Sequence, residues 1–152
     1  MDLILWRHAE AHEGTPLLPD RDRRLTPKGR LQSREMGDWL RIRLPRPVLV
    51  LASPSVRTCE TADGLGIPFE SRESLGTDTS AVHFLEATGW PDGEGCVVAV
   101  GHQPTLGQVA SMILTGEAQP WSVQKGAIWW FRIKRSEGGK PVLRLVLSPG
   151  LL

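Results

Sequence analysis

Three short apolar runs in the chain are each followed at once by polar or charged residues. The runs are residues 3–6, 48–52 and 97–100. Unbroken apolar runs of this length are typical of strands buried on both faces, as in a parallel sheet. We therefore expect an α/β fold: a three-layer sandwich in which helices cover both faces of a central, mostly parallel sheet.

Helix signals follow the first two runs. Thr26 and Pro27 supply a hydroxyl cap and a first-turn proline for one helix, and Pro45 stops it. A second helix follows residues 48–52, with Ser53 as its cap. The apolar residues that recur at roughly helical spacing on the first helix, and that we expect to face the core, are Leu31, Met36, Trp39, Leu40 and Leu44.

Two further helices are expected later in the chain. One covers residues 81–87, and the other is opened by Pro104 and closed by Gly116. His83 lies within the first of these and has no partner in the sequence, so we expect it to be structural or exposed. The side chains of that helix that we expect to point inward are Val82, Phe84 and Leu85.

The last third of the chain alternates apolar and polar residues. Residues 127–133 and 142–147 therefore predict two strands of an antiparallel hairpin at the edge of the sheet. The first of them contains three adjacent aromatic residues, Trp129, Trp130 and Phe131. Such a run could form a stacking platform for bases, but packing within a sheet is the more common use, and we favour it.

Composition narrows the possible functions. The chain has 152 residues and a net charge of +1, so we expect a single domain over residues 1–152 and no bulk binding to nucleic acid or to an anionic membrane. No apolar run approaches membrane-spanning length, and the first run is too short for a signal peptide. Cys59 and Cys96 show no pairing pattern, which favours free thiols in a reducing compartment and a cytoplasmic location.

The candidate catalytic residues lie where the three apolar runs end. Arg7 and His8 follow the first run, and His102 follows the third. Arg57 falls in the first turn of the helix after the second run, where it can point back over the same sheet edge. In open α/β sheets the carboxyl edge of the strands is where ligands bind.

Two guanidinium groups and a histidine around another histidine suit a compact dianion, meaning a phosphoryl group. Arginine forks match phosphate oxygens in bidentate fashion. One imidazole can attack phosphorus while the cations stabilise charge on the equatorial oxygens. The histidines lack metal-ligand spacing and no acids cluster with them, so no metal site is expected.

A charge-dense loop follows the first candidate residues. Residues 20–24 read Asp-Arg-Asp-Arg-Arg. Most charge runs are simply solvated loops, but here Arg21, Arg23 and Arg24 could form a basic rim at the entrance to the site. Arg23 is therefore a candidate for substrate binding, and the exposed cations are expected to steer the encounter with a phosphorylated substrate, an effect that weakens with salt.

Several motifs together carry a family resemblance. Arg7-His8-Ala9-Glu10 resembles the Arg-His-Gly signature of the histidine phosphatase superfamily, which has the phosphoglycerate-mutase-like fold. The later motifs match in the family's order and span most of the chain: Leu25-Thr26-Pro27-Lys28-Gly29, Ser53-Pro54 with Arg57-Thr58 and Glu60-Thr61, and Gly101-His102. The small size and the Asp20-x-x-Arg23-x-Leu25-Thr26 segment are most similar to the SixA-type phosphohistidine phosphatases.

The resemblance implies His8 as the nucleophile, and Arg7, Arg57 and His102 as phosphate ligands. It implies no metal and no organic cofactor. Larger family members also carry a general-acid carboxylate, for which Glu73 is a candidate by position and Asp78 a weaker one. If neither serves, the site should favour phosphohistidine, because an imidazole leaving group can already be protonated.

The predicted function is therefore a phosphatase that works through a covalent phosphohistidine intermediate on His8, with a phosphohistidine protein as its partner. Two alternatives stay open. One is a small-molecule phosphomonoester phosphatase or mutase acting on a small phosphorylated substrate. The other is a phosphate-binding module that has lost catalysis.

Overall fold

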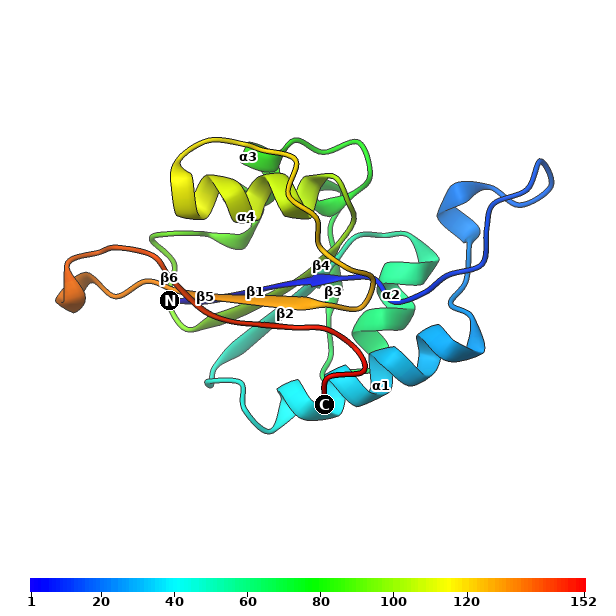
Figure 1. Ribbon diagram of the computed structural model, residues 1–152, viewed down its shortest axis with the longest axis horizontal. Coiled ribbons are helices and arrows are strands. Elements are labelled where there is room, and N and C mark those ends of the chain that lie inside the picture. Colours follow the sequence, from blue (N-terminus) through cyan, green and yellow to red (C-terminus); the bar gives the residue numbers. More distant parts are fainter.

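A six-stranded sheet crosses the molecule in the computed structural model, which describes residues 1–152 (Figure 1). Its order is β3-β2-β4-β1-β5-β6. The four strands from β3 to β1 are parallel to one another, and β5 runs antiparallel to both of its neighbours. The strands are β1 Asp2–Arg7, β2 Val48–Ala52, β3 Glu70–Ser71, β4 Cys96–Gly101, β5 Ile128–Arg132 and β6 Val142–Leu147.

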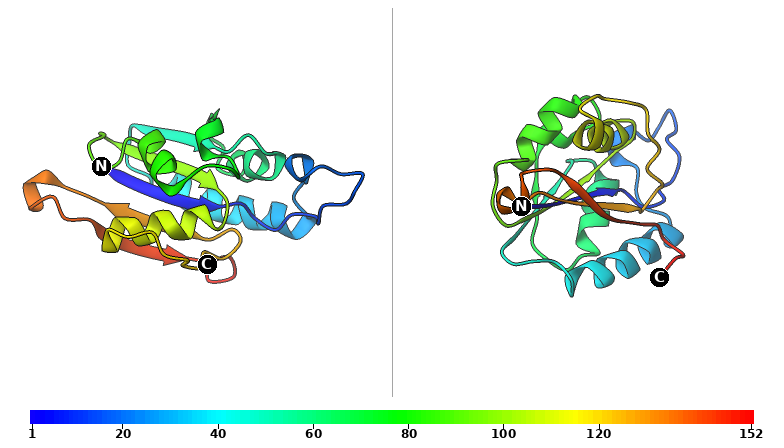
Figure 2. Two further views of the ribbon diagram at one scale, coloured as in Figure 1. Left: turned by 90° about the horizontal axis from the view of Figure 1, so that it is seen from above. Right: turned by 60° about the vertical axis from the view of Figure 1, so that its left-hand side comes forward.

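Four helices cover the two faces of the sheet (Figures 1 and 2). They are α1 Pro27–Arg41 and α2 Val56–Asp63 on one face, and α3 Ala81–Thr88 and α4 Thr105–Thr115 on the other. Three short 3-10 helices lie in the connections, at Asp20–Asp22, Glu73–Leu75 and Arg135–Glu137. The three-layer α/β architecture expected from the sequence is confirmed.

The apolar strands are buried on both faces because successive side chains point to opposite layers. Leu3 and Leu5 of β1 belong to the cluster under α3 and α4, whereas Ile4 and Trp6 belong to the cluster over α1 and α2. None of the helices has the length and apolar character needed to cross a bilayer.

The buried face of α1 differs from the expected one. Met36 and Leu40 are buried as expected, but Leu31 is 49% exposed. Small residues such as Gly37 occupy the buried face of α1 instead of Leu31. Gly37 packs against the end of α2 so closely that a Cβ on it would overlap the carbonyl group of Gly64. Close packing of the helix backbones therefore rotates Leu31 toward solvent.

The inward face of α3 also differs from the predicted one. Phe84 is fully buried and Leu85 is half-buried, but Val82 is 50% exposed. The helix is only eight residues long and buries Ala81, Phe84 and Thr88, so its inner stripe excludes the position of Val82. His83 lies on the exposed side.

The hairpin of β5 and β6 is antiparallel as predicted. Trp130 and Phe131 are buried in opposite core clusters, one on each face of the sheet. The interpretation of this aromatic run as sheet packing is therefore confirmed, and these two rings are not available as a stacking platform.

The register of the strands brings the candidate catalytic residues to one edge of the sheet. Arg7 pairs with Gly101 across β1 and β4, and Ala52 pairs with Val100 across β2 and β4. The ladder continues one residue further, because the His8 amide donates to the carbonyl of Gly101 at 3.1 Å. His8 and His102, which follow these paired positions, therefore emerge side by side at the carboxyl ends of the parallel strands.

Candidate active site

His8 lies at the end of β1 and is only 6% exposed. Its Nδ1 is 2.8 Å from the carbonyl oxygen of Ala9. A carbonyl can only accept a hydrogen bond, so Nδ1 carries the proton in the neutral ring and Nε2 keeps its lone pair. The turn itself is held by Thr61, whose Oγ1 accepts from the Ala9 amide at 3.0 Å. The backbone thus presents one defined nitrogen of His8 as a nucleophile.

The surroundings of His8 keep its imidazole uncharged. Burial lowers its pKa to about 4, and the positive charges of Arg57, Arg7 and Arg23 act in the same direction. The hydrogen bond to Ala9 opposes this shift without reversing it. Near neutral pH the Nε2 lone pair is therefore free to attack an electrophile.

His102 stands beside His8, with the two ring centroids 5.4 Å apart. Its Nε2 lies 2.8 Å from Oγ of Ser53 and 3.3 Å from Oγ of Ser55. Burial, followed by the charge of Arg57, lowers its pKa to about 3. Its Nδ1 is buried and has no hydrogen-bond partner within the protein.

Ser53 does not cap α2 as the sequence suggested. The residue before that helix is Ser55, which makes no side-chain capping bond to it. Ser53 instead contacts the ring of His102, and Ser55 Oγ contacts both His102 and Thr58 Oγ1. The two serines therefore orient the second histidine.

Arg57 is the second residue of α2 and is 4% exposed, in agreement with its expected place at the sheet edge. Its Nη1 donates to the backbone carbonyl of Asp20 at 2.7 Å, and its Nη2 donates to Oδ2 of Asp20 at 3.1 Å. Its Nε is buried without a partner. Burial lowers its pKa from the ordinary value.

Arg7, the last residue of β1, is held from the opposite side. Its Nη1 donates to the carbonyl of Val123 at 2.8 Å, and its Nε is buried without a partner. Burial and then the charge of Arg57 lower its pKa. Unpartnered buried donors are costly, so two such groups beside His8 fit an anion that accepts from both.

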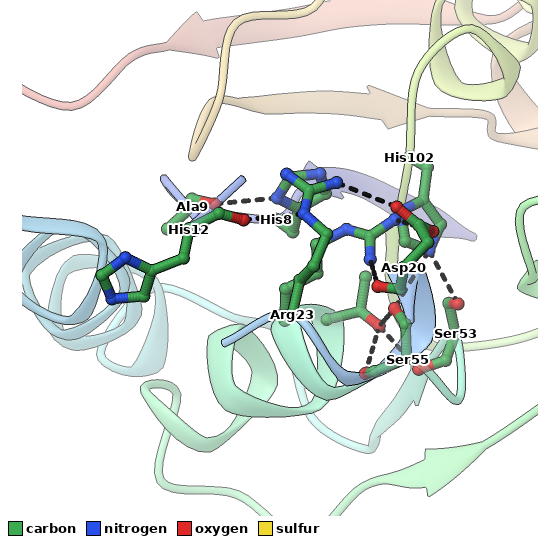
Figure 3. A network of polar contacts seen from close by, with 10 residues as sticks. His8, Ala9, His12, Asp20, Arg23, Ser53, Ser55 and His102 are labelled. Atoms are coloured by element: carbon green, nitrogen blue, oxygen red, sulfur yellow. Dashed lines mark hydrogen bonds and ion pairs between the residues drawn. The ribbon is translucent and has the colours of Figure 1, made fainter. Parts of the chain in front are cut away.

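Asp20 is the site residue that sequence reasoning missed. Its carboxylate binds Arg57 and also accepts from Nη1 of Arg23 at 3.0 Å (Figure 3). The hydrogen bond from Arg23 is the largest cause of its lowered pKa, so the carboxyl group is ionised. The charge alternation in residues 20–24 was the available signal, but nothing in it showed which arginine Asp20 would meet.

Arg23 lies inside the site instead of at its rim. Its side chain is 17% exposed, and its Nε donates to the carbonyl of His12 at 2.7 Å. Its neighbours are also paired: Arg21 with Glu73 and Arg24 with Glu60, each at 3.4 Å. Each of the three arginines has a carboxylate partner, and the basic rim at the entrance to the site stays a prediction.

The Leu-Thr-Pro-Lys-Gly motif supports the turn after His8. Thr26 accepts from the Gly29 amide at 3.0 Å as the N-cap of α1, and its hydroxyl donates to Oε2 of Glu10 at 2.7 Å. Gly29 lies against the backbone of Glu10 so closely that a Cβ would overlap its carbonyl oxygen. The start of α1 is therefore seated directly on the chain that leaves the nucleophile.

Arg7, His8, Arg57 and His102 form a cage at the sheet edge. A polar cavity of about 550 Å³ lies next to this cage, although none of the four residues lines the cavity. It is bounded by Asp20, Ser53 and Ser55, which also contact the cage residues, and by the connection that carries Glu73 and Asp78. The Glu73 side chain is 79% exposed and Asp78 is also exposed, so neither carboxyl group is buried beside His8. No group of three or more His, Cys, Asp or Glu side chains is placed to hold a metal ion.

Comparison with known proteins agrees with this geometry. Residues 3–76 match the model of the histidine phosphatase superfamily (branch 1). An uncharacterised protein of Mycobacterium leprae is 34% identical over 115 residues, which cover 72% of this chain and 71% of that protein. The chain belongs to the histidine phosphatase superfamily.

Solved structures place it more closely within the fold. A Nakamurella multipartitia protein whose name assigns it to phosphohistidine phosphatase SixA is 25% identical, with a TM-score of 0.80 over 98% of this chain and 96% of that one. A protein histidine phosphatase SixA complexed with tungstate has a TM-score of 0.79 at 24% identity over 98% and 97%. An Entamoeba histolytica phosphoserine phosphatase mutant has a TM-score of 0.72 at 18% identity over 99% of both chains.

Proposed function

We propose that this phosphatase removes phosphoryl groups from phosphohistidine in proteins, through a covalent intermediate on Nε2 of His8. The observation that carries the proposal is the bond from Nδ1 of His8 to the carbonyl of Ala9, which leaves a neutral ring with Nε2 free. Around that ring, Arg7 and Arg57 each keep an unpartnered buried Nε–H. A nucleophile and two anion donors at one point suit phosphoryl transfer.

The proposed reaction has two displacements. The lone pair of His8 Nε2 forms a bond to phosphorus, and the bond from phosphorus to the substrate's nitrogen breaks, with the electron pair leaving on the departing imidazole. Arg7 and Arg57 donate to the equatorial oxygens as charge develops there. A water oxygen then bonds to the phosphorus of phosphorylated His8, and the bond from phosphorus to Nε2 breaks with its electron pair returning to Nε2. The protons of the water leave with the inorganic phosphate, and the neutral imidazole is restored.

The leaving group is the basis for choosing phosphohistidine. An alkoxide must be protonated as it leaves, whereas an imidazole leaving a phosphoramidate can already carry its proton. Asp20 is the carboxyl group that touches the cage, and two arginines hold it ionised. Glu73 is well exposed and paired with Arg21. The carboxyl group that contacts the cage is therefore ionised, and Glu73 is held in an exposed ion pair, which favours a leaving group that needs no general acid.

The similarity to SixA structures supports the same substrate class. One of them binds tungstate, an oxyanion that can take the place of phosphate. A general phosphomonoester phosphatase is the competing function. It predicts comparable turnover of phosphoserine and sugar phosphates.

The test is a panel of substrates at one enzyme concentration. Phosphate release is measured from a phosphohistidine protein, a phosphoserine peptide and a sugar phosphate, with His8→Ala as the inactive control. The proposal predicts that kcat/KM for the phosphohistidine protein exceeds the other two by at least tenfold. Equal or faster turnover of the sugar phosphate would make the chain a general phosphatase. Absence of turnover with all three would make it a binding module.

A further inference from the structure

We propose that Asp20 is the positioning residue for Arg57. It binds one edge of the Arg57 guanidinium group, so that the other edge, which carries the free Nε–H, is held ready for the phosphoryl group. This inference deepens the proposed function and rests on the phosphoryl cage described there. Three observations carry it: the two bonds between Asp20 and Arg57, the unpartnered Nε of Arg57, and the anchoring of the segment that contains Asp20.

The guanidinium group of Arg57 has two edges that can each donate a pair of parallel hydrogen bonds. One edge consists of Nη1 and Nη2, and the other consists of Nε and Nη2. Asp20 takes the first edge, because its backbone carbonyl accepts from Nη1 at 2.7 Å and its Oδ2 accepts from Nη2 at 3.1 Å. No other group of the protein accepts a hydrogen bond from this guanidinium, and its Nε is buried without a partner. The second edge is therefore the one left for an anion.

The free edge belongs to a group that lies beside both histidines of the cage. The charge of Arg57 is one of the causes that lower the pKa of His8 and of His102, and the Arg57 side chain is only 4% exposed. A phosphoryl group on His8 would meet this edge, and the buried Nε–H would gain the acceptor that the protein itself does not supply.

Arg23 depends on Asp20 less than Arg57 does. Oδ1 of Asp20 accepts from Nη1 of Arg23 at 3.0 Å (Figure 3). Nε of Arg23 also donates to the carbonyl of His12 at 2.7 Å, which gives this side chain a second anchor. Arg57 has no second anchor. Removal of the Asp20 carboxylate should therefore release the Arg57 fork, while Arg23 keeps one of its bonds.

The segment that carries Asp20 is itself held against α2. Asp20 opens a 3-10 helix, and its carbonyl also accepts from the Arg23 amide at 3.3 Å. Further along, the Leu25 amide donates to Oε1 of Glu60, a residue of α2, at 3.2 Å. Arg57 belongs to the same helix, so the arginine and its partner are fixed to one element. Donors that are oriented before the reaction stabilise the transition state more than donors that must first be ordered.

A carboxylate beside an arginine can also act as a competitor that the phosphoryl group must displace. The two roles differ in which edge is occupied. Asp20 uses the edge formed by Nη1 and Nη2 and leaves Nε free. The geometry therefore favours positioning over competition.

The test compares Asp20→Asn with a matched control, Asp22→Asn. The first substitution keeps the backbone carbonyl and the size of the side chain but removes the charge. Asp22 is an exposed residue of the same 3-10 helix and forms none of the ion pairs described above. Three quantities are measured: kcat/KM for para-nitrophenyl phosphate and for phenyl phosphate, the Kd of inorganic phosphate by calorimetry, and the NMR signal of the Arg57 Nε–H.

For Asp20→Asn we expect kcat/KM to fall by about tenfold with both aryl phosphates, because the arginine is present but no longer held. The Kd of inorganic phosphate should change by less than about threefold, since the loss of orientation is offset by the loss of a repelling charge. Adding Asp20→Asn to Arg57→Ala should lower kcat/KM by less than about twofold more, because Asp20 acts through Arg57. Asp22→Asn should match the wild type.

Four results would overturn the inference. A full additional loss in the Arg57→Ala background would show that Asp20 does not act through Arg57. Faster turnover with much tighter phosphate binding in Asp20→Asn would make Asp20 a competitor. A larger loss for phenyl phosphate than for para-nitrophenyl phosphate, whose leaving group needs no proton, would make it a general acid. An equal loss of kcat/KM and of phosphate affinity, together with lower stability in urea, would leave it only a structural role.

The NMR signal separates this inference from the proposed function. The Arg57 Nε–H should give one ordered signal in the wild type that shifts when inorganic phosphate binds, and Asp20→Asn should broaden or lose that signal. If the wild type releases phosphate from no compound while the signal behaves in this way, the proposed function fails and the positioning role stands. If the signal and its shift are the same in Asp20→Asn, the positioning role fails whatever the activity.

Discussion

Acidification should destabilise this protein through the two histidines of its site. Both are nearly fully buried, and their pKa values lie at about 4 for His8 and about 3 for His102. In the unfolded chain an imidazole takes up a proton near pH 6.5. The unfolded state therefore binds more protons than the folded state between about pH 6.5 and pH 4, and stability must fall as the pH falls through that window.

The size of the effect follows from the two shifts. Between pH 7 and pH 5 each neutral buried imidazole removes about 2 kcal/mol from the free energy of unfolding, so the pair removes about 4 kcal/mol. A domain of this size has a total stability of roughly 5–15 kcal/mol. Above pH 6.5 the contribution is constant, and below the folded pKa values it levels off again.

The assay is urea unfolding at pH 7 and pH 5 in a phosphate-free buffer, because a bound dianion would favour the charged imidazoles. His8→Asn and His102→Asn should each reduce the loss by about 2 kcal/mol, and the double variant should lose almost nothing from this source. The control, His83→Asn, changes an exposed histidine and should behave like the wild type. If the double variant lost as much stability as the wild type, the two rings would not be the buried neutral groups described above.

Substitutions at three positions test the residues around the nucleophile. Arg57→Ala should lower kcat by about a hundredfold or more with the fold retained, and Arg57→Lys should not restore full activity in a steady-state assay, because lysine lacks the planar fork; full rescue would reduce Arg57 to a diffuse charge. Gly29→Ala should cost about 1–3 kcal/mol in urea unfolding and lower kcat, because its Cβ would displace the backbone of Glu10; unchanged values would refute the close seating of α1. Thr61→Val should leave the Ala9 amide without its acceptor and cost about 1–3 kcal/mol by the same measurement; a neutral result would show that the turn does not need this bond.

The apolar pattern of the chain was sufficient to predict the main helices, the strands and the three layers. Apolar runs of four or five residues, each ended by polar groups, defined the three central strands. The same pattern was not sufficient to predict which face of each helix is buried. Leu31 faces solvent where Gly37 of the same helix packs closely against Gly64, and Val82 faces solvent because Ala81, Phe84 and Thr88 form the buried stripe of α3. That choice depends on helix-to-helix distance, which no local pattern contains.

The residues of the candidate site could likewise be predicted only in part. Arg7, His8 and His102 could be placed because parallel strands end at a common edge. The partners of Arg57 and His102 could not be placed, because Asp20 and Ser53 come from other segments, and their roles arise only when those segments meet. The partners of the charged loop could not be placed for the same reason: charge counting located the arginines but not the carboxylates, such as Glu60, that pair with them.

The central claim is that His8 becomes covalently phosphorylated during turnover. It is tested most directly by quenching the enzyme in alkali within one turnover of a phosphohistidine protein and locating the phosphoryl group by peptide mass spectrometry. The account predicts a phosphorylated peptide that contains His8, labile in acid, absent in His8→Ala and accumulated when hydrolysis is slowed. Full phosphate release by an enzyme that never carries the group on His8, or by the His8→Ala variant itself, would contradict it.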